Sequence, residues 1–159
     1  MALKREDGRP EWSTPFGSAG APGWGGFAGP RCTPTVDGEL VFAVAQFGEA
    51  ACLDAATGKI LWAHDFNKEY GRSTPTWGYA SHPLIDGQKV ICLAGGEGTE
   101  VVAFDKDSGK ELWRSLSARE PGYGTPMLLE AGGKRQLIVW HPEALNSVDP
   151  DTGKVYWSI

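Results

Sequence analysis

Short apolar runs alternate with clusters of Gly, Pro, Asp and Asn along the whole chain. The runs are rich in Val, Ile, Leu, Phe and Trp, which favour strands, and the residues between them favour turns. No segment shows the sustained 3-4 spacing of apolar residues that an amphipathic helix requires. The pattern predicts an all-β protein. The first four expected strands are Cys32 to Val36, Glu39 to Gln46, Ala50 to Asp54 and Lys59 to Phe66.

This set of four strands occurs three times. The second set reads "SHPLI", "KVICLAG", "EVVAFD" and "KELWRSL", and the third reads "TPMLLE", "RQLIVWH", "ALNSVD" and "KVYWSI". The second run of each set is almost continuously apolar, as expected for a strand covered on both faces. Four antiparallel strands in a repeat of roughly 40–50 residues are typical of one β-propeller blade.

A short motif marks the end of each set. It reads "CLDAATGKILW" (Cys52 to Trp62), "AFDKDSGKELW" (Ala103 to Trp113) and "SVDPDTGKVYW" (Ser147 to Trp157). In every copy an Asp precedes the Gly by four residues and a Trp follows it by four. A proline keeps the same phase, at Pro34, Pro83 and Pro126. Because two separate markers keep step, the chain is predicted to be a true repeat.

A degenerate fourth copy, "ALKREDGRPEW", begins the chain, with Gly8 and Trp12 in the motif positions and Lys4 in place of the Asp. We therefore expect residues 1–16 to form the closing hairpin of a preceding blade. A Gly-rich connector is expected over residues 17–29, and three blades over residues 30–66, 80–116 and 123–159.

The motif residues suit a tight hairpin between the third and fourth strands. Asp and Thr or Ser side chains can bond backbone amides that the turn leaves free, and Gly can adopt positive φ. The Lys begins the outer strand in water, and the Trp fills the seam between blades if its ring N–H finds a partner. These roles are structural, so Asp54, Asp105 and Asp149 are expected to belong to turns.

Composition narrows the function classes. The 159 residues suit one domain, and 41% hydrophobic with 22% charged residues is ordinary for a globular protein. A net charge of −5 argues against nucleic acid or an anionic membrane as partner. No apolar run reaches the length of about 18 residues that a membrane span needs. The first residues lack the apolar core of a signal peptide, which predicts either a cytoplasmic protein or an internal piece of a longer one.

Few residues suggest chemistry. Cys32, Cys52 and Cys92 lack metal-ligand spacing and are expected to be buried thiols, with one disulfide and one free cysteine as the alternative. The three histidines are too irregularly spaced for a metal site; they are His64, His82 and His141. The glycine clusters Gly23 to Gly29 and Ala94 to Glu100 lack the context of a dinucleotide or phosphate loop and are interpreted as connecting loops.

Two longer loops, Asn67 to Tyr79 and Ser117 to Gly124, should lie on one rim between blades. They carry aromatic and arginine residues, which are favoured at binding surfaces; these are Tyr70, Arg72, Trp77, Tyr79, Arg119 and Tyr123. The alternative, which we favour, is that Trp77, Tyr79 and Tyr123 pack inward at the start of the next blade.

The Asp-x-x-Thr/Ser-Gly-Lys-x-x-Trp repeat resembles the pyrroloquinoline-quinone (PQQ) type of propeller repeat. That family includes quinoprotein dehydrogenases, the outer-membrane-assembly lipoprotein and many secreted bacterial repeat proteins. The resemblance implies a ring of usually eight blades, docked by tryptophans, in the periplasm or outside the cell. This chain then looks like an excerpt, with the remaining blades of a parent chain as its neighbours.

The resemblance implies two functions. The favoured one is a non-enzymatic scaffold with protein partners on its rim and no cofactor. The alternative is a fragment of a PQQ- and calcium-dependent alcohol or sugar dehydrogenase, whose family holds the cofactor on the propeller axis, often beside a disulfide between adjacent cysteines. No adjacent Cys pair occurs, and nothing in the spacing singles out Arg31, Trp77 or Asn146. We therefore predict no catalytic, cofactor-binding or metal-binding residue. Copies of the chain completing a ring are a third possibility.

Overall fold

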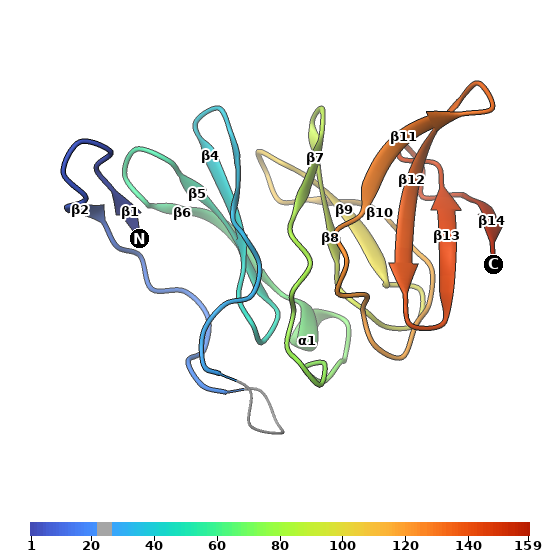
Figure 1. Cartoon of the computed structure of the whole chain (residues 1–159), viewed down its shortest axis with the longest axis horizontal. Helices are drawn as coiled ribbons and strands as arrows, with labels where there is room; N and C mark the ends of the chain where they lie inside the picture. Colours follow the sequence, from blue (N-terminus) through green and yellow to red (C-terminus); the bar gives the residue numbers. More distant parts are fainter. Residues whose placement is uncertain (22–26) are drawn as a thin grey trace.

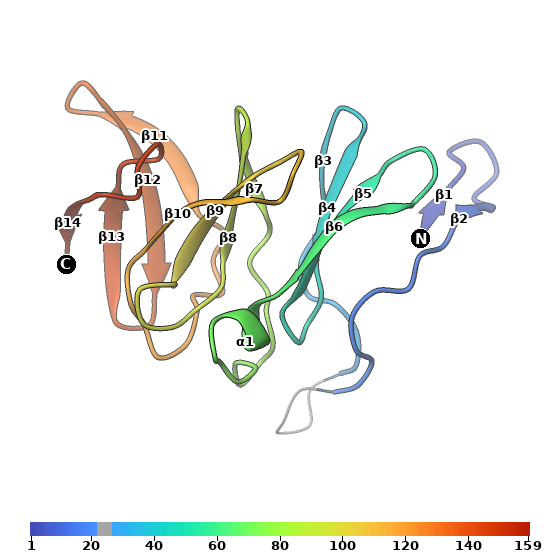
Figure 2. The ribbon, with the colours of Figure 1, turned by 180° about the vertical axis from the view of Figure 1, so that it is seen from behind.

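The computed structural model describes residues 1–21 and 27–159, and its elements are strands with one short helix (Figures 1 and 2). Three four-stranded antiparallel sheets and a two-stranded hairpin each follow chain order, which confirms the all-β prediction. We call the sheets the first, second and third blades. Their strands are β3 (Thr35–Asp37), β4 (Leu40–Val44), β5 (Glu49–Asp54) and β6 (Ile60–Asp65); β7 (Leu84–Asp86), β8 (Lys89–Leu93), β9 (Val101–Asp105) and β10 (Glu111–Ser115); and β11 (Met127–Ala131), β12 (Lys134–His141), β13 (Ala144–Val148) and β14 (Val155–Ser158).

The degenerate copy of the motif forms the hairpin of β1 (Ala2–Leu3) and β2 (Pro10–Trp12), packed beside the first blade (Figure 1). The innermost strands are shorter than the sequence suggested, with β3 starting at Thr35 and β7 at Leu84. Pro34 and Pro83 directly precede these strands. Each strand starts after its proline because a residue without N–H cannot donate a hydrogen bond to the ladder.

One helical turn, α1 (Phe66–Glu69), was not predicted. Asp65 caps its N-terminus, where the Asp65 carboxylate accepts a hydrogen bond from the Lys68 backbone N–H. An Asp followed within a turn by Glu is a recognisable helix start, but the segment is too short to show helical periodicity. Within the residues that the structure describes, no helix is long and apolar enough to cross a membrane.

The blades stand in a row with their faces in contact (Figures 1 and 2). Phe42 and Cys52 of the first blade pack against Val90 and Phe104 of the second, and all four are at most 1% exposed. A second cluster joins the second and third blades; it includes Ile91, Val101, Ala103, Leu137, Val139 and Val148. The middle blade is therefore covered on both faces, which explains its continuous apolar runs.

The three cysteines are buried free thiols, as expected. Burial raises the pKa of Cys32 and Cys92 to about 12 and that of Cys52 to about 11. Because the thiolate is the reactive form, these side chains act as small apolar groups near neutral pH.

The motif aspartates bind their own turns. Asp54 Oδ1 accepts hydrogen bonds from the Thr57 hydroxyl (2.6 Å) and backbone N–H (2.7 Å). Asp105 Oδ1 accepts the same pair from Ser108, at 2.6 and 2.8 Å. Asp149 accepts from the Tyr156 hydroxyl at 2.8 Å and from two turn amides. These bonds lower the pKa of all three carboxyls and confirm their place in turns.

The motif Gly and Trp are partners across neighbouring repeats. Trp12 lies on Gly58, Trp62 on Gly109 and Trp113 on Gly153, so a Cβ at Gly109 or Gly153 would lie 2.7 Å from the ring. The indole N–H of Trp12 donates to Ala55 O and that of Trp62 to Lys106 O, both at 2.9 Å. The glycine therefore permits the turn with its positive φ and also makes room for the preceding tryptophan.

Replacing Gly109 with alanine should lower the free energy of unfolding by about 1–3 kcal/mol more than replacing Gly133 does. The two glycines have nearly the same φ, 72° and 71°, so the backbone strain is matched. Nothing lies within 4 Å of a Cβ at Gly133, whereas at Gly109 the Trp62 ring must move. Urea unfolding of the two variants measures the difference, and equal losses would show that strain alone makes the glycine necessary.

Candidate functional site

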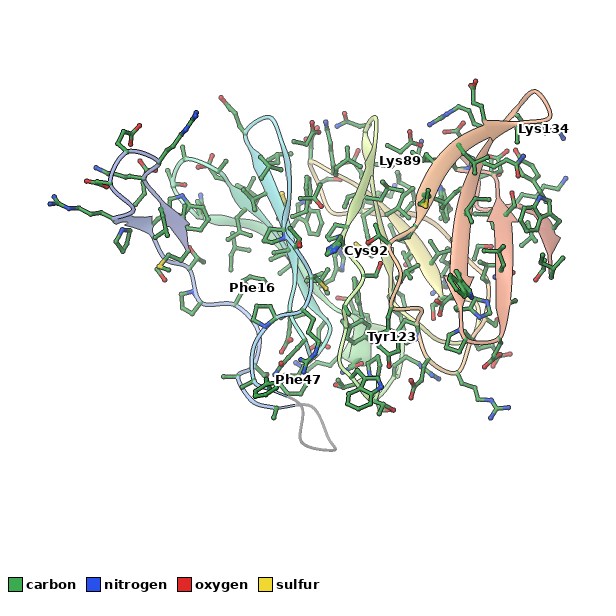
Figure 3. The ribbon with its side chains drawn as sticks, in the orientation of Figure 1. Phe16, Phe47, Lys89, Cys92, Tyr123 and Lys134 are labelled. Carbon is green, nitrogen blue, oxygen red and sulfur yellow. The ribbon has the colours of Figure 1, made fainter. Side chains whose placement is uncertain are left out.

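The two ends of the blades differ in structure. The hairpin turns after the first and third strands lie at one end, which we call the turn rim. The connectors between blades and the loops after the second strands lie at the other, which we call the connector rim. Figure 3 shows Lys89 and Lys134 at the turn rim and Tyr123 at the connector rim.

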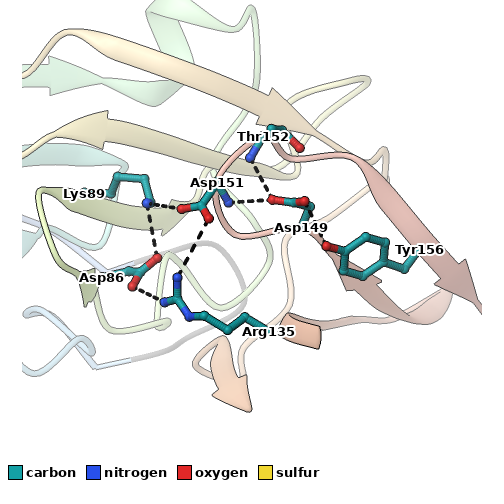
Figure 4. Close-up of polar contacts among 7 residues, drawn as sticks. All are labelled: Asp86, Lys89, Arg135, Asp149, Asp151, Thr152 and Tyr156. Carbon is teal, nitrogen blue, oxygen red and sulfur yellow. Dashed lines mark hydrogen bonds and ion pairs between the residues drawn. The ribbon is translucent and has the colours of Figure 1, made fainter. Parts of the chain in front are cut away.

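Ion pairs link neighbouring blades at the turn rim. Lys106 Nζ lies 2.6 Å from Asp37 Oδ2 across the first seam. Across the second seam, Lys89 Nζ lies 2.7 Å from Asp151 and 3.3 Å from Asp86, and Arg135 also pairs with Asp86 (Figure 4). Each of these carboxylates is already paired with a cation, so this charged cluster stabilises the contacts between blades.

The histidines occupy three separate places. His64 bridges the first seam, with Nδ1 2.8 Å from Glu69 Oε2 and Nε2 2.8 Å from Gly109 O. His82 Nδ1 accepts the Thr33 N–H at 2.9 Å. His141 is buried, which lowers its pKa. Within residues 1–21 and 27–159, no three or more His, Cys, Asp or Glu side chains gather as metal ligands would.

The residues considered for a quinone site also lie apart. Arg31 donates to Gly29 O and Phe27 O within its own loop and to Gln46 Oε1 in the turn between β4 and β5. Asn146, in β13, accepts a 2.7 Å bond from the Ser158 hydroxyl inside the third blade. Trp77 lies in the connector after α1. These side chains make no converging donor set and do not fit a quinone with its calcium.

Of the two glycine clusters, Ala94 to Glu100 connects β8 to β9, which confirms its interpretation as a loop between strands. In the cluster Gly23 to Gly29, residues 23–26 lie outside the described residues.

The connector rim joins the two aromatic loops by hydrogen bonds. Arg72 donates to Arg119 O, and the Thr76 hydroxyl donates to Glu120 at 2.7 Å. The Tyr123 hydroxyl donates to the other Glu120 oxygen at 3.1 Å and accepts the Trp77 backbone N–H at 3.4 Å. The two connectors thus form one surface, held by side chains from both.

The expectation that all three rim aromatics pack inward was wrong for two of them. Tyr79 is 3% exposed and packs on Phe66, but Trp77 is 53% and Tyr123 37% exposed. The chain bends between Trp77 and Tyr79 at Gly78, where φ is 75° and a Cβ would lie 2.8 Å from Gln46 O. This bend sends Tyr79 into the core and leaves Trp77 on the surface.

Glu100 was missed in the sequence as a candidate. It is fully buried under the connector, where Oε1 accepts the Gly122 N–H at 3.1 Å, and Oε2 has no partner within the part of the chain that the structure describes. Burial raises its pKa to about 8, and Glu143 adds to the rise while Arg72 opposes it. The available signal was a carboxylate directly before an apolar strand, in "TEVVAFD".

Comparison with known proteins places the fold. The profile of the family described as "Outer membrane protein assembly factor BamB" matches residues 1–159. The chain belongs to the BamB family. BamB of Burkholderia pseudomallei (strain K96243) is 27% identical over 130 residues, covering 81% of this chain and 31% of that protein.

The chain is also similar to quinoprotein dehydrogenases. The quinoprotein ethanol dehydrogenase of Pseudomonas aeruginosa is 27% identical, covering 93% of this chain and 25% of the enzyme. The crystal structure of BamB from Moraxella catarrhalis superposes with a TM-score of 0.60 at 23% identity, covering 81% of this chain and 36% of that one. This BamB-family chain is a segment of PQQ-like β-propeller and spans about a third or less of these relatives.

Proposed function

We propose that this BamB-like propeller is a non-enzymatic scaffold that binds a protein partner at its connector rim. The observation that carries the proposal is the exposure of Trp77 and Tyr123 on connectors that hydrogen bonds hold together. Aromatic side chains dominate binding energies at protein interfaces, and groups fixed before binding lose less entropy.

The surroundings of these aromatics also suit a protein partner. Glu120 accepts the Tyr123 hydroxyl, and its neighbour Arg119 is 94% exposed in its side chain, so charged groups accompany the exposed aromatics on this connector, as they do at the edges of protein interfaces. The net charge of −5 makes nucleic acid an unsuitable partner. The BamB relatives, named as outer membrane protein assembly factors, support the same class of function and a periplasmic location.

A fragment of a PQQ- and calcium-dependent dehydrogenase is the second candidate. The long match to a quinoprotein ethanol dehydrogenase favours it. In that case the quinone and calcium would be held by other blades, because the described residues offer no converging set of ligands and the motif aspartates are committed to their turns.

Photo-crosslinking in bacteria tests the scaffold. A photoreactive residue in place of Trp77 should give a discrete crosslinked protein, and Tyr123→Ala should weaken capture by about tenfold. The same residue at Leu112, which is 48% exposed on β10, serves as the control. Equal products at both positions would contradict the rim assignment. Dye reduction by the full-length protein with PQQ, calcium and ethanol would favour the dehydrogenase.

A further inference from the structure

The exposed aromatic residues of the connector rim share one anchor, the carboxylate of Glu120. Its Oε1 accepts the Thr76 hydroxyl at 2.7 Å, and its Oε2 accepts the Tyr123 hydroxyl at 3.1 Å. Thr76 directly precedes Trp77 in the chain. Each carboxylate oxygen therefore holds either an exposed aromatic side chain or the residue next to one.

The contacts around Glu120 form a closed circuit between the two connectors. The Tyr123 hydroxyl that donates to Glu120 also accepts the Trp77 backbone N–H at 3.4 Å. The circuit therefore runs from Glu120 through Thr76 and Trp77 to Tyr123 and back to Glu120. Because the circuit is closed, Trp77 cannot move away from the connector that carries Tyr123 without breaking one of these hydrogen bonds.

The bonds to Glu120 are the strong members of this circuit. Hydrogen bonds to a carboxylate are roughly twice as strong as those between neutral groups. The bond from Trp77 to Tyr123 joins two neutral groups at 3.4 Å, which is longer than the usual range of about 2.7–3.2 Å. Without the carboxylate, this long bond alone would join the two aromatic positions.

Packing restrains the two aromatic side chains only in part. Trp77 is 53% and Tyr123 37% exposed, so neighbouring atoms cover only part of each ring. Glu100 holds Gly122 on one side of Tyr123, but on the other side no atom lies within 4 Å of a Cβ at Gly124. Glycine leaves the backbone more conformational freedom than other residues do. A side-chain anchor is therefore needed to keep the Tyr123 ring in one place.

We propose that Glu120 is a positioning residue for partner binding, which fixes Tyr123 and the Trp77 segment in the arrangement that a protein partner meets. This role rests on the proposed scaffold function and names the residue that prepares its surface. Side chains that are ordered before association lose less entropy on binding. The residues of the circuit belong to the connectors that enter and leave the second blade, and Figure 3 shows Tyr123 away from both ends of the row of blades.

The pKa of the Tyr123 hydroxyl reports on this anchor without any partner. Burial raises this pKa most, and the hydrogen bond and charge of Glu120 raise it further, whereas the Trp77 N–H lowers it. Glu120→Ala and Glu120→Gln both remove the charge, so each should lower the pKa of Tyr123. A ¹³C NMR titration of labelled tyrosine measures the change, with Tyr123→Phe to assign the signal. An unchanged pKa in both variants would show that Glu120 does not hold the hydroxyl and would overturn the proposal.

Capture of the partner separates position from charge. The measure is the yield of the product that the photoreactive residue at position 77 gives in bacteria carrying the full-length protein. Glu120→Ala should lower this yield about three- to tenfold, because Tyr123 and the position 77 segment must then be ordered on binding. Glu120→Gln should stay within about twofold, since an amide can accept the Thr76 hydroxyl and donate to the Tyr123 oxygen. Glu130→Ala is the matched control, because it removes an exposed carboxylate beside the turn between β11 and β12, and it should change neither yield nor pKa.

The outcomes distinguish the positioning role from the scaffold function. If the protein with Glu120 intact gives no discrete product, the scaffold function fails and the positioning role fails with it. If that protein captures a partner and Glu120→Ala captures as much, the positioning role alone is overturned. A loss in Glu120→Gln as large as in Glu120→Ala would also overturn it, because the carboxylate charge would then contact the partner directly. Circular dichroism should show unchanged strands in each variant, since the bonds of Glu120 lie on the connectors.

Discussion

Replacing Trp113 with alanine should lower the free energy of unfolding by about 3–5 kcal/mol. The side chain is 8% exposed and lies between the second and third blades, on Gly153 and within the cluster that contains Leu137 and Val148. The blades on either side of the ring are hydrogen-bonded sheets and cannot easily close the space that the ring leaves, so most of the cavity should persist. Urea denaturation of the folded chain measures the loss, and a value below about 1 kcal/mol would show that Trp113 does not hold the seam.

Phenylalanine substitutions separate packing from hydrogen bonding at the same motif position. Trp62 donates to Lys106 O, whereas the Trp113 N–H is buried without a partner among the described residues. Trp62→Phe should therefore cost about 0.5–1.5 kcal/mol more than Trp113→Phe, since only the first change breaks a hydrogen bond. Equal costs would mean that the Trp62 bond contributes nothing net.

The strands and turns could be predicted because they depend on local chemistry. Asp54 and Thr57 lie three residues apart and bond each other, and Pro34 stops a strand by lacking an N–H. The pairing of Trp62 with Gly109 could not be predicted in the same way. It joins residues 47 positions apart, and the turn alone already explains a glycine.

The candidate site was less predictable, for a similar reason. The sequence placed Trp77 and Tyr123 on one rim but could not tell which way each side chain points. That depends on the bend at Gly78, which is set by the approach of Gln46 O from the first blade. The burial of Glu100 depends on the connector residue Gly122 lying over it. Neither contact leaves a periodic mark in the sequence.

The wild type should lose roughly 3–5 kcal/mol of stability between about pH 4.5 and pH 8, and replacing Glu100 with glutamine should abolish this loss. Burial raises the pKa of the folded carboxyl from 4.5 to about 8, so over this range the folded chain keeps a proton that the unfolded chain has lost. The wild type should therefore lose stability as the pH rises through this window and then level off. Glutamine resembles the protonated acid and can still accept the Gly122 N–H, so the variant should lack this slope.

Urea unfolding at a series of pH values, on the wild type and Glu100→Gln, measures this difference. The two proteins should have similar stability near pH 4 and diverge above it, with the variant the more stable at pH 9. The charged groups that act on Glu100 are Glu143, which raises its pKa, and Arg72, which lowers it. Glu143→Gln should therefore move the transition to lower pH without removing it. If Glu100→Gln retained the wild-type slope, the proton lost in this window would belong to another group, and Glu100 would be ionised beneath the connector at neutral pH.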